Sequence, residues 1–288
     1  MTEQKQFTVE RGGPNVVVIG FEPTHAGWTQ DVLLRADVHW DNPKCRRDIE
    51  LKHLKQAAER GAPIIDAGDL FCAMQGKFDK RASKSNLRPE HCEGSYLDTL
   101  VSTAAEYYKP FAEQFAVIGT GNHETSIYAK HETDLSQRLA DSLRSFGSPV
   151  IRNGYSGWVV FRFQRGNART SRKLWYTHGY GGGGPVTMDM IQANRQSVYV
   201  EDADVTLSGH THDAWYAEKQ RIKLGNDYTI KQRTLYQLKT PTYKDAYANG
   251  EGGFEIEKGH PPKPLGAWWM RFTMDHKDHI EMTFERAT

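Results

Sequence analysis

Residue types that bind metal ions recur in short motifs along this 288-residue chain. The motifs, in order, are Asp37-Val38-His39, Gly68-Asp69, Gly121-Asn122-His123-Glu124, His178 and Gly209-His210-Thr211-His212. Their carboxylate, amide and imidazole groups suit Mn²⁺, Fe, Zn²⁺ or Ni²⁺, and the number of imidazoles argues against a pure Ca²⁺ or Mg²⁺ site. Asp37 and His39 are two residues apart, as are His210 and His212, so each pair lies on one side of an extended segment and can chelate one ion.

Each motif begins where a short apolar segment ends, and such segments are typical of buried strands. The strands predicted before the motifs span residues 32–36, 62–67, 116–119, 172–177 and 204–208. Ligands bind in the crevice beyond the carboxyl ends of strands in α/β sheets, so the motifs are expected to meet at one edge. A single Asp or His at a strand end is more often a turn former. The prediction therefore depends on all the motifs together.

The remaining segments alternate between helical and strand patterns. Helices are predicted at residues 46–60, 96–115 and 134–146, and further strands at 16–21, 157–164, 213–221, 228–239, 267–274 and 279–285. This pattern predicts an α/β layered architecture. With no repeat and no linker, we expect one domain over residues 1–288, with a metal-site core at 15–215 and C-terminal strands with a substrate-side loop at 216–288.

Composition limits the classes of function. The net charge of +1 gives no field that favours nucleic acid or a membrane, and the N-terminal residues 1–13 are polar and lack the apolar core of a signal peptide. The three cysteines form no CxxC pair, which is typical of reduced thiols and argues against a cysteine-based zinc site. We therefore expect a cytoplasmic protein without a membrane partner.

In this order the motifs resemble the calcineurin-like metallophosphoesterases, whose pattern is D-x-H, G-D, G-N-H-[DE], H and G-H-x-H. The resemblance covers about residues 32–212. It implies a four-layer αββα sandwich with two mixed β-sheets and the metal site at one sheet edge. It also implies two divalent metal ions, with Mn²⁺ expected first and Fe, Zn²⁺ or Ni²⁺ as alternatives.

The resemblance also implies a role for each residue. The first ion would be held by Asp37, His39 and His212, the second by Asn122, His178 and His210, and both by the bridging Asp69; His123 would be catalytic rather than a ligand. The implied reaction is hydrolysis of phosphomonoesters or phosphodiesters by a metal-bridging hydroxide, with His123 as the acid.

The substrate is less closely defined. A phosphodiesterase or nuclease is preferred over a phosphatase, because the segment Asp69-Leu70-Phe71 resembles repair nucleases of the family. The expected partner is thus a phosphate ester, with nucleotides and nucleic acids as candidate classes, and the oligomeric state stays open. Residues 240–265 are rich in Gly, Pro and Tyr without periodicity, and we expect them to form a loop that selects the substrate.

One position departs from the family pattern. Many members carry an acid three residues after the bridging Asp, where it can orient the catalytic histidine, whereas this chain has Cys72. The chain also lacks the Asp-Arg-Gly of Ser/Thr protein phosphatases, so that activity is disfavoured. Glu124 is one candidate for orienting His123. The alternative function is a non-catalytic binding scaffold with the same fold, but such scaffolds typically lack ligands that are all present here.

Overall fold

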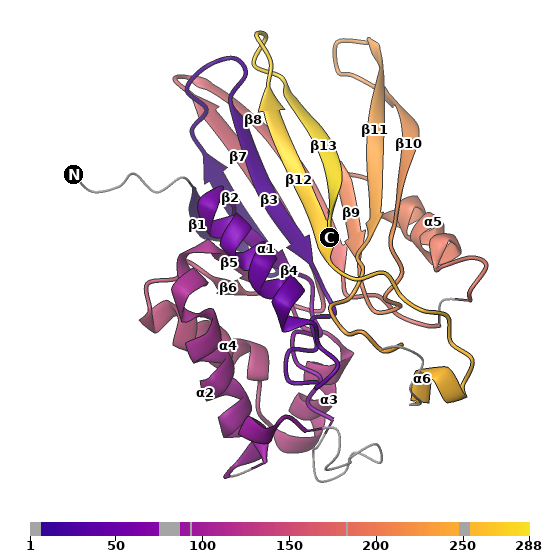
Figure 1. Ribbon diagram of the computed structural model, residues 1–288. Coiled ribbons are helices and arrows are strands. Elements are labelled where there is room, and N and C mark those ends of the chain that lie inside the picture. The colour runs from indigo at the N-terminus through magenta and orange to yellow at the C-terminus, as the bar shows by residue number, and fades with distance from the viewer. Residues whose placement is uncertain (1–6, 75–86, 93, 183, 248–253) are drawn as a thin grey trace.

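Two mixed β-sheets form the body of the molecule (Figure 1). The computed structural model describes residues 7–74, 87–92, 94–182, 184–247 and 254–288. The seven-stranded sheet has the order β1 (Thr8–Gly13), β2 (Val16–Phe21), β7 (Ser156–Arg165), β8 (Ala168–Thr177), β9 (Val205–Ser208), β11 (Ile230–Lys239), β10 (Trp215–Leu224). The six-stranded sheet has the order β13 (Ile280–Ala287), β12 (Ala267–Met274), β3 (Thr29–Arg35), β4 (Ile64–Asp66), β5 (Phe115–Ile118), β6 (Ile151–Arg152).

Parallel strands lie at the centre of each sheet. β3, β4 and β5 are parallel neighbours in one sheet, and β8 and β9 are parallel neighbours in the other. Parallel strands bring their carboxyl ends to the same edge. Each of these five strands therefore ends shortly before one of the motifs predicted to bind metal.

Helices cover the outer faces of the sheets. The helices are α1 (Arg47–Glu59), α2 (Tyr96–Tyr108), α3 (Asn122–His131), α4 (Leu135–Ser145), α5 (Met190–Tyr199) and α6 (Phe254–Glu257), with 3-10 turns η2 (Pro89–His91) and η3 (Lys109–Gln114). Figure 1 shows α1, α2 and α4 on the side of the six-stranded sheet, and α5 beside the other sheet. No helix among the described residues is long and apolar enough to cross a membrane.

Separate apolar clusters hold these elements together. One cluster contains buried residues from both sheets, among them Phe161 of β7 and Phe272 of β12, whose ring centroids are 4.9 Å apart. A second cluster joins the six-stranded sheet to the helices through residues such as Leu54, Leu100 and Leu139. Burial of these side chains supplies the main driving force for packing the sheets and helices.

Most predicted elements are present, with two kinds of difference. The helix predicted at 96–115 ends at Tyr108, because Pro110 lacks the backbone N–H that would continue it, and a 3-10 turn and β5 follow. The strands β1 and β6 and the helices α3, α5 and α6 were not predicted. α3 has a weak apolar face and begins inside a motif predicted to bind metal, so its local pattern gives no helix signal.

Candidate metal centre

The loops after β3 and β4 are joined by backbone hydrogen bonds. The N–H of Asp37 donates to the carbonyl of Gly68 at 2.9 Å, and that of His39 donates to the carbonyl of Asp69 at 3.0 Å. The Asp37 carbonyl accepts from the hydroxyl of Thr242 at 2.7 Å. Hydrogen bonds thus join two segments about thirty residues apart, and Thr242 joins the segment after β11 to them.

Several candidate ligands have a strained backbone. The φ angles in the left-handed region belong to Asp37 (54°), His39 (49°), Asp69 (53°), His210 (76°) and His212 (61°). This conformation is uncommon for residues other than glycine, costs on the order of 1–3 kcal/mol each and clusters at functional sites. The hydrogen bonds between the loops offset part of that cost. In this conformation the side chains of Asp37 and His39 both lie in one group of potential ligands.

Asp37, His39 and His212 form a first group of potential ligands. One ligand atom from each lies within 4.8 Å of the others. Asp37 Oδ1 is 3.4 Å from His212 Nε2, and the Nε2 atoms of the two histidines are 3.2 Å apart. Asp37 Oδ1 is buried and has no hydrogen-bond partner among the described residues. Because a buried carboxylate oxygen is costly to leave unpaired, this group fits a bound cation.

Asp69, His178 and His210 form a second group, again with ligand atoms within 4.8 Å of one another. His178 Nε2 is 3.1 Å from Asp69 Oδ2 and 3.1 Å from the amide oxygen of Asn122, which is also 2.8 Å from His210 Nδ1. The other nitrogen of His178, Nδ1, donates to the Ala67 carbonyl at 3.2 Å. This hydrogen bond fixes the ring so that Nε2 faces the group, as metal-binding histidines require.

The electrostatics of the site favour positive charge at its centre. Burial lowers the pKa of His178, but the Asp69 and Asp37 carboxylates outweigh it and raise the pKa to about 9. Burial, with His123 and His212 nearby, holds the pKa of His39 well below its usual value, so the ring is neutral and one of its nitrogens has a lone pair that can bind a metal. Burial opposes ionisation of Asp69, yet the neighbouring His178 and His123 lower its pKa overall. A metal ion would displace the proton of His178, and ionised carboxylates with neutral imidazoles are the donor set of a transition-metal site.

His123 stands beside these groups rather than within them. Its backbone N–H, in the first turn of α3, donates to Asp69 Oδ1 at 2.9 Å, and its ring Nδ1 donates to the carbonyl of Cys72 at 2.5 Å. Nε2 is 3.7 Å from Asp69 Oδ2. A backbone carbonyl, that of Cys72, therefore orients the ring.

Glu124 binds backbone N–H groups and does not orient His123, the role for which it was a candidate. Its carboxylate accepts backbone N–H groups from Gly121 at 2.8 Å, Asp69 at 3.1 Å and Phe71 at 2.8 Å. Burial and the neighbouring Asp69 raise its pKa to about 8. Glu124 thus ties the start of α3 to the loop after β4.

Two glycines are required by close packing at the ligands. A Cβ atom at Gly121 would lie 2.0 Å from Asp69 Oδ1, and one at Gly209 would lie 2.4 Å from Asp37 Oδ2. Both distances are shorter than any tolerated contact. Only glycine lets the backbone approach these carboxylates so closely.

Asp41 was not predicted from the sequence. It is buried, and its carboxylate accepts the backbone N–H of Cys72 at 2.6 Å and of Ala73 at 2.9 Å, as well as the Tyr96 hydroxyl at 3.2 Å. It thereby fixes the turn whose carbonyl holds His123. The available signal was its position two residues after His39, which continues the alternation of the Asp37-Val38-His39 motif.

A small pocket lies against the His210–His212 segment. It has a volume of about 280 Å³ and is lined by Gly181, Gly182, His210, Thr211, His212, Ala246, Tyr247, His260, Pro261, Pro262 and Lys263. Part of the predicted substrate-side loop therefore does lie next to the candidate ligands. The expected loop residues 248–253 fall outside the described residues.

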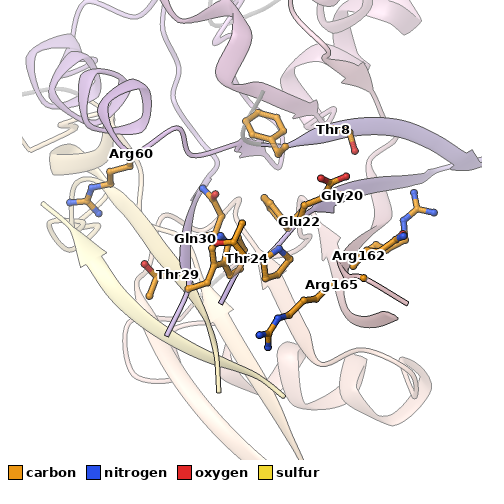
Figure 2. Close-up of a pocket in the computed structure, with 15 residues that line it drawn as sticks. Thr8, Gly20, Glu22, Thr24, Thr29, Gln30, Arg60, Arg162 and Arg165 are labelled. Carbon is orange, nitrogen blue, oxygen red and sulfur yellow. The ribbon is translucent and has the colours of Figure 1, made fainter. Parts of the chain in front are cut away.

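A larger cavity lies elsewhere. It has a volume of about 1010 Å³ and opens beside the start of β3, as Figure 2 shows. Its arginines are paired: Arg60 contacts Asp31 at 3.1 Å, and Arg165 contacts Asp278 at 2.6 Å. None of the described residues that line it is a candidate metal ligand. The smaller pocket, which touches the ligands, is therefore the better candidate for binding substrate.

Comparisons with known proteins give only distant similarity. No protein-family model matches the chain, and a search of curated proteins finds no similar sequence. The chain is similar to the crystal structure of Vps29 from Chaetomium thermophilum, with 10% identity, 91% of this chain and 95% of that chain covered, and a TM-score of 0.29. It is also similar to GAP50, the anchor in the inner membrane complex of Plasmodium, with 10% identity, coverage of 90% and 85%, and a TM-score of 0.41.

Proposed function

We propose that this chain is a dinuclear metal-dependent phosphoesterase with a four-layer αββα sandwich fold. One observation carries the proposal: the two groups of ligand atoms adjoin each other. His178 Nε2 of the second group lies 3.9 Å from Asp37 Oδ1 of the first. Two adjoining groups built from carboxylate, amide and imidazole donors fit a pair of divalent ions, for which Mn²⁺ is the first choice.

Each residue has a defined place in this proposal. Asp37, His39 and His212 would hold one ion, Asn122, His178 and His210 the other, and Asp69 both. When bound, the ions would neutralise charge on the phosphoryl group and lower the pKa of a water molecule. The loop hydrogen bonds and the left-handed backbone pre-organise the donors, so little reorganisation is needed on binding.

His123 would act as the acid. Its Nδ1 proton is committed to the Cys72 carbonyl, which leaves Nε2 as the nitrogen that can hold and release a proton. The imidazole is partly exposed, and Nε2 lies 3.7 Å from Asp69 Oδ2. Proton donation from Nε2 to the leaving oxygen is the step that His123 would perform.

The pocket beside His210 and His212 would receive the group esterified to the phosphate. At about 280 Å³ it lies at the small end of the range for small-molecule sites, roughly 300–1,000 Å³. Its lining combines Tyr247, Pro261 and Pro262 with the polar His260. These surroundings suit a compact, partly apolar group such as a nucleoside, and we keep the preference for a phosphodiester or nucleotide substrate.

The test is an assay with Mn²⁺ of bis-p-nitrophenyl phosphate, p-nitrophenyl phosphate and a panel of nucleotides and nucleic acids. We expect turnover, with the diester preferred, and two metal ions per chain by elemental analysis. Two bound ions without turnover of any substrate would instead favour the binding scaffold. Absence of bound metal would refute both the dinuclear site and the reaction.

A further inference from the structure

A third group of potential ligands lies beside the two already described. One ring nitrogen each of His39 and His123 and the sulfur of Cys72 lie within 4.8 Å of one another. The rings of the two histidines meet edge to face, with centroids 5.0 Å apart. No local sequence pattern indicates this group, because its members come from the loops after β3 and β4 and from the first turn of α3.

The donors of this group differ in kind from those of the other two. It contains a sulfur and no carboxylate, and thiolate with imidazole is the donor set that selects Zn²⁺ and softer ions over Mn²⁺. A tetrahedral Zn²⁺ ion holds such ligand atoms roughly 3.5 Å apart. The present spacing of up to 4.8 Å exceeds this by about one ångström, which rotation of the side chains can close.

Each donor is available for such an ion. His39 directs Nε2 at Asp37 and His212, while its buried Nδ1 has no hydrogen-bond partner among the described residues. His123 has Nε2 to offer, because Nδ1 donates to the backbone. The Cys72 sulfur has only weak contacts, accepting from Asn42 Nδ2 at 3.4 Å and donating to the Met74 sulfur at 3.3 Å.

Cys72 is also held in place independently of any metal. The Asp41 carboxylate binds the N–H groups of Cys72 and Ala73, and Ala73 adopts a left-handed φ of 47°. Burial raises the pKa of the thiol to about 12, so the sulfur keeps its proton until a metal ion displaces it. Binding would therefore release one proton and form one metal–sulfur bond.

We propose that His39, Cys72 and His123 form a third, inhibitory metal site that takes a thiophilic ion such as Zn²⁺. An ion there would bind the nitrogen with which His123 donates its proton, and would draw His39 away from the first group. The inhibition rests on the proposed function, whereas the binding does not. The site would make the activity sensitive to thiophilic metals at concentrations above those that load the other two groups.

The experiment compares two proteins that each keep one buried thiol. The test protein, Cys45→Ser/Cys92→Ser, retains only Cys72. The control protein, Cys72→Ser/Cys92→Ser, retains only Cys45. Cys45 is as buried as Cys72, with exposed fractions of 5% and 3%, but belongs to no ligand group among the described residues. Each is titrated with Cd²⁺ while the ultraviolet charge-transfer band of a cadmium–thiolate bond is recorded. We expect a band that develops once the other two groups are loaded and saturates at one thiolate-bound Cd²⁺ per chain in the Cys72 protein, and no band in the Cys45 protein. His123→Gln in the Cys72 protein should weaken Cd²⁺ binding at least tenfold.

Other outcomes would overturn the site. They are equal bands in both single-thiol proteins, no band in the Cys72 protein, or binding that is unchanged by His123→Gln. If either protein fails to fold, X-ray absorption spectroscopy identifies the atoms bound to Cd²⁺ in the unaltered chain. We expect one sulfur together with nitrogen ligands. Oxygen ligands alone would contradict the proposal. Inhibition of turnover by Zn²⁺ is measured in a separate assay. A chain that shows the cadmium–thiolate band but hydrolyses no substrate would refute the proposed function and still support the third metal site.

Discussion

His123 Nδ1 lies 2.5 Å from the carbonyl oxygen of Cys72. A main-chain group thus orients the imidazole in this chain, at the position where many calcineurin-like metallophosphoesterases have a side-chain acid. A backbone carbonyl is neutral, so it fixes the ring tautomer without adding the charge of a carboxylate. The Asp41 carboxylate holds the carbonyl in place from the other side of the turn.

Replacing His123 tests its role as the acid. We expect His123→Gln to reduce kcat roughly 10²–10⁴-fold, the usual contribution of a general acid, and to leave the metal content unchanged. The measurement is steady-state turnover of the preferred diester together with elemental analysis. His25→Gln, at an exposed histidine, is the control and should retain full activity. An unchanged kcat in His123→Gln would remove His123 from the mechanism.

Asp41 is expected to act through His123 as a positioning residue. Asp41→Asn loses one of the two hydrogen bonds to the turn, and the displaced ring should lower kcat about 10- to 100-fold with little change in KM or metal content. The decisive readout is the double variant with His123→Gln, in which Asp41→Asn should cost nothing further. An additional, independent loss in that background would show that Asp41 acts by another route.

Asp69 is expected to be essential for metal binding. In Asp69→Asn the bridging charge is lost and the N–H of His123 loses its ionised acceptor, so we expect at least one of two ions to be lost along with the activity. Metal content after gel filtration measures this directly. Asp141→Asn, whose side chain is 58% exposed, is the matched control. Full metal occupancy in Asp69→Asn would contradict the assignment.

His53 should make the fold sensitive to acid. It is buried against the hydroxyl of Tyr243 at 2.9 Å, and burial lowers its pKa to about 4. The unfolded state binds the proton more tightly, so the contribution of His53 is complete above pH 6.5 and is lost as the pH falls towards 4. Between pH 7 and 4.5 the loss is roughly 2 kcal/mol. Urea unfolding of His53→Gln should show a smaller loss over this range, and parallel curves for the two proteins would exclude the effect.

The N-terminus of α4 depends on Asp134. Its carboxylate accepts the N–H of Gln137 at 2.9 Å and also pairs with Arg152 at 2.8 Å. We expect Asp134→Ala to lower the free energy of unfolding by about 1 kcal/mol through loss of the cap. Asp134→Asn keeps a capping oxygen and loses only the charge, so it should cost less. Equal losses in chemical denaturation would assign the effect to the ion pair instead.

The sequence by itself determined which residues could bind metal and where they stand relative to the strands. Residue type sets the ligand chemistry, and the period of apolar residues sets the local structure, so both are readable from short segments. The strands predicted at 16–21 and 267–274 are confirmed as β2 and β12. Local pattern was insufficient where a proline altered the end of α2 or where α3 began inside a motif.

The tertiary structure decided how those residues meet. Packing of one sheet against the other brings His178 beside Asp69, and hydrogen bonds between loops force Asp37 into a left-handed backbone. The group that orients His123 is a main-chain carbonyl, which every residue carries and no sequence pattern distinguishes. The same holds for the group formed by Cys72, His39 and His123, since only the packing of three distant segments brings a thiol to two imidazoles. Ligand identity is local chemistry, whereas ligand geometry depends on long-range packing.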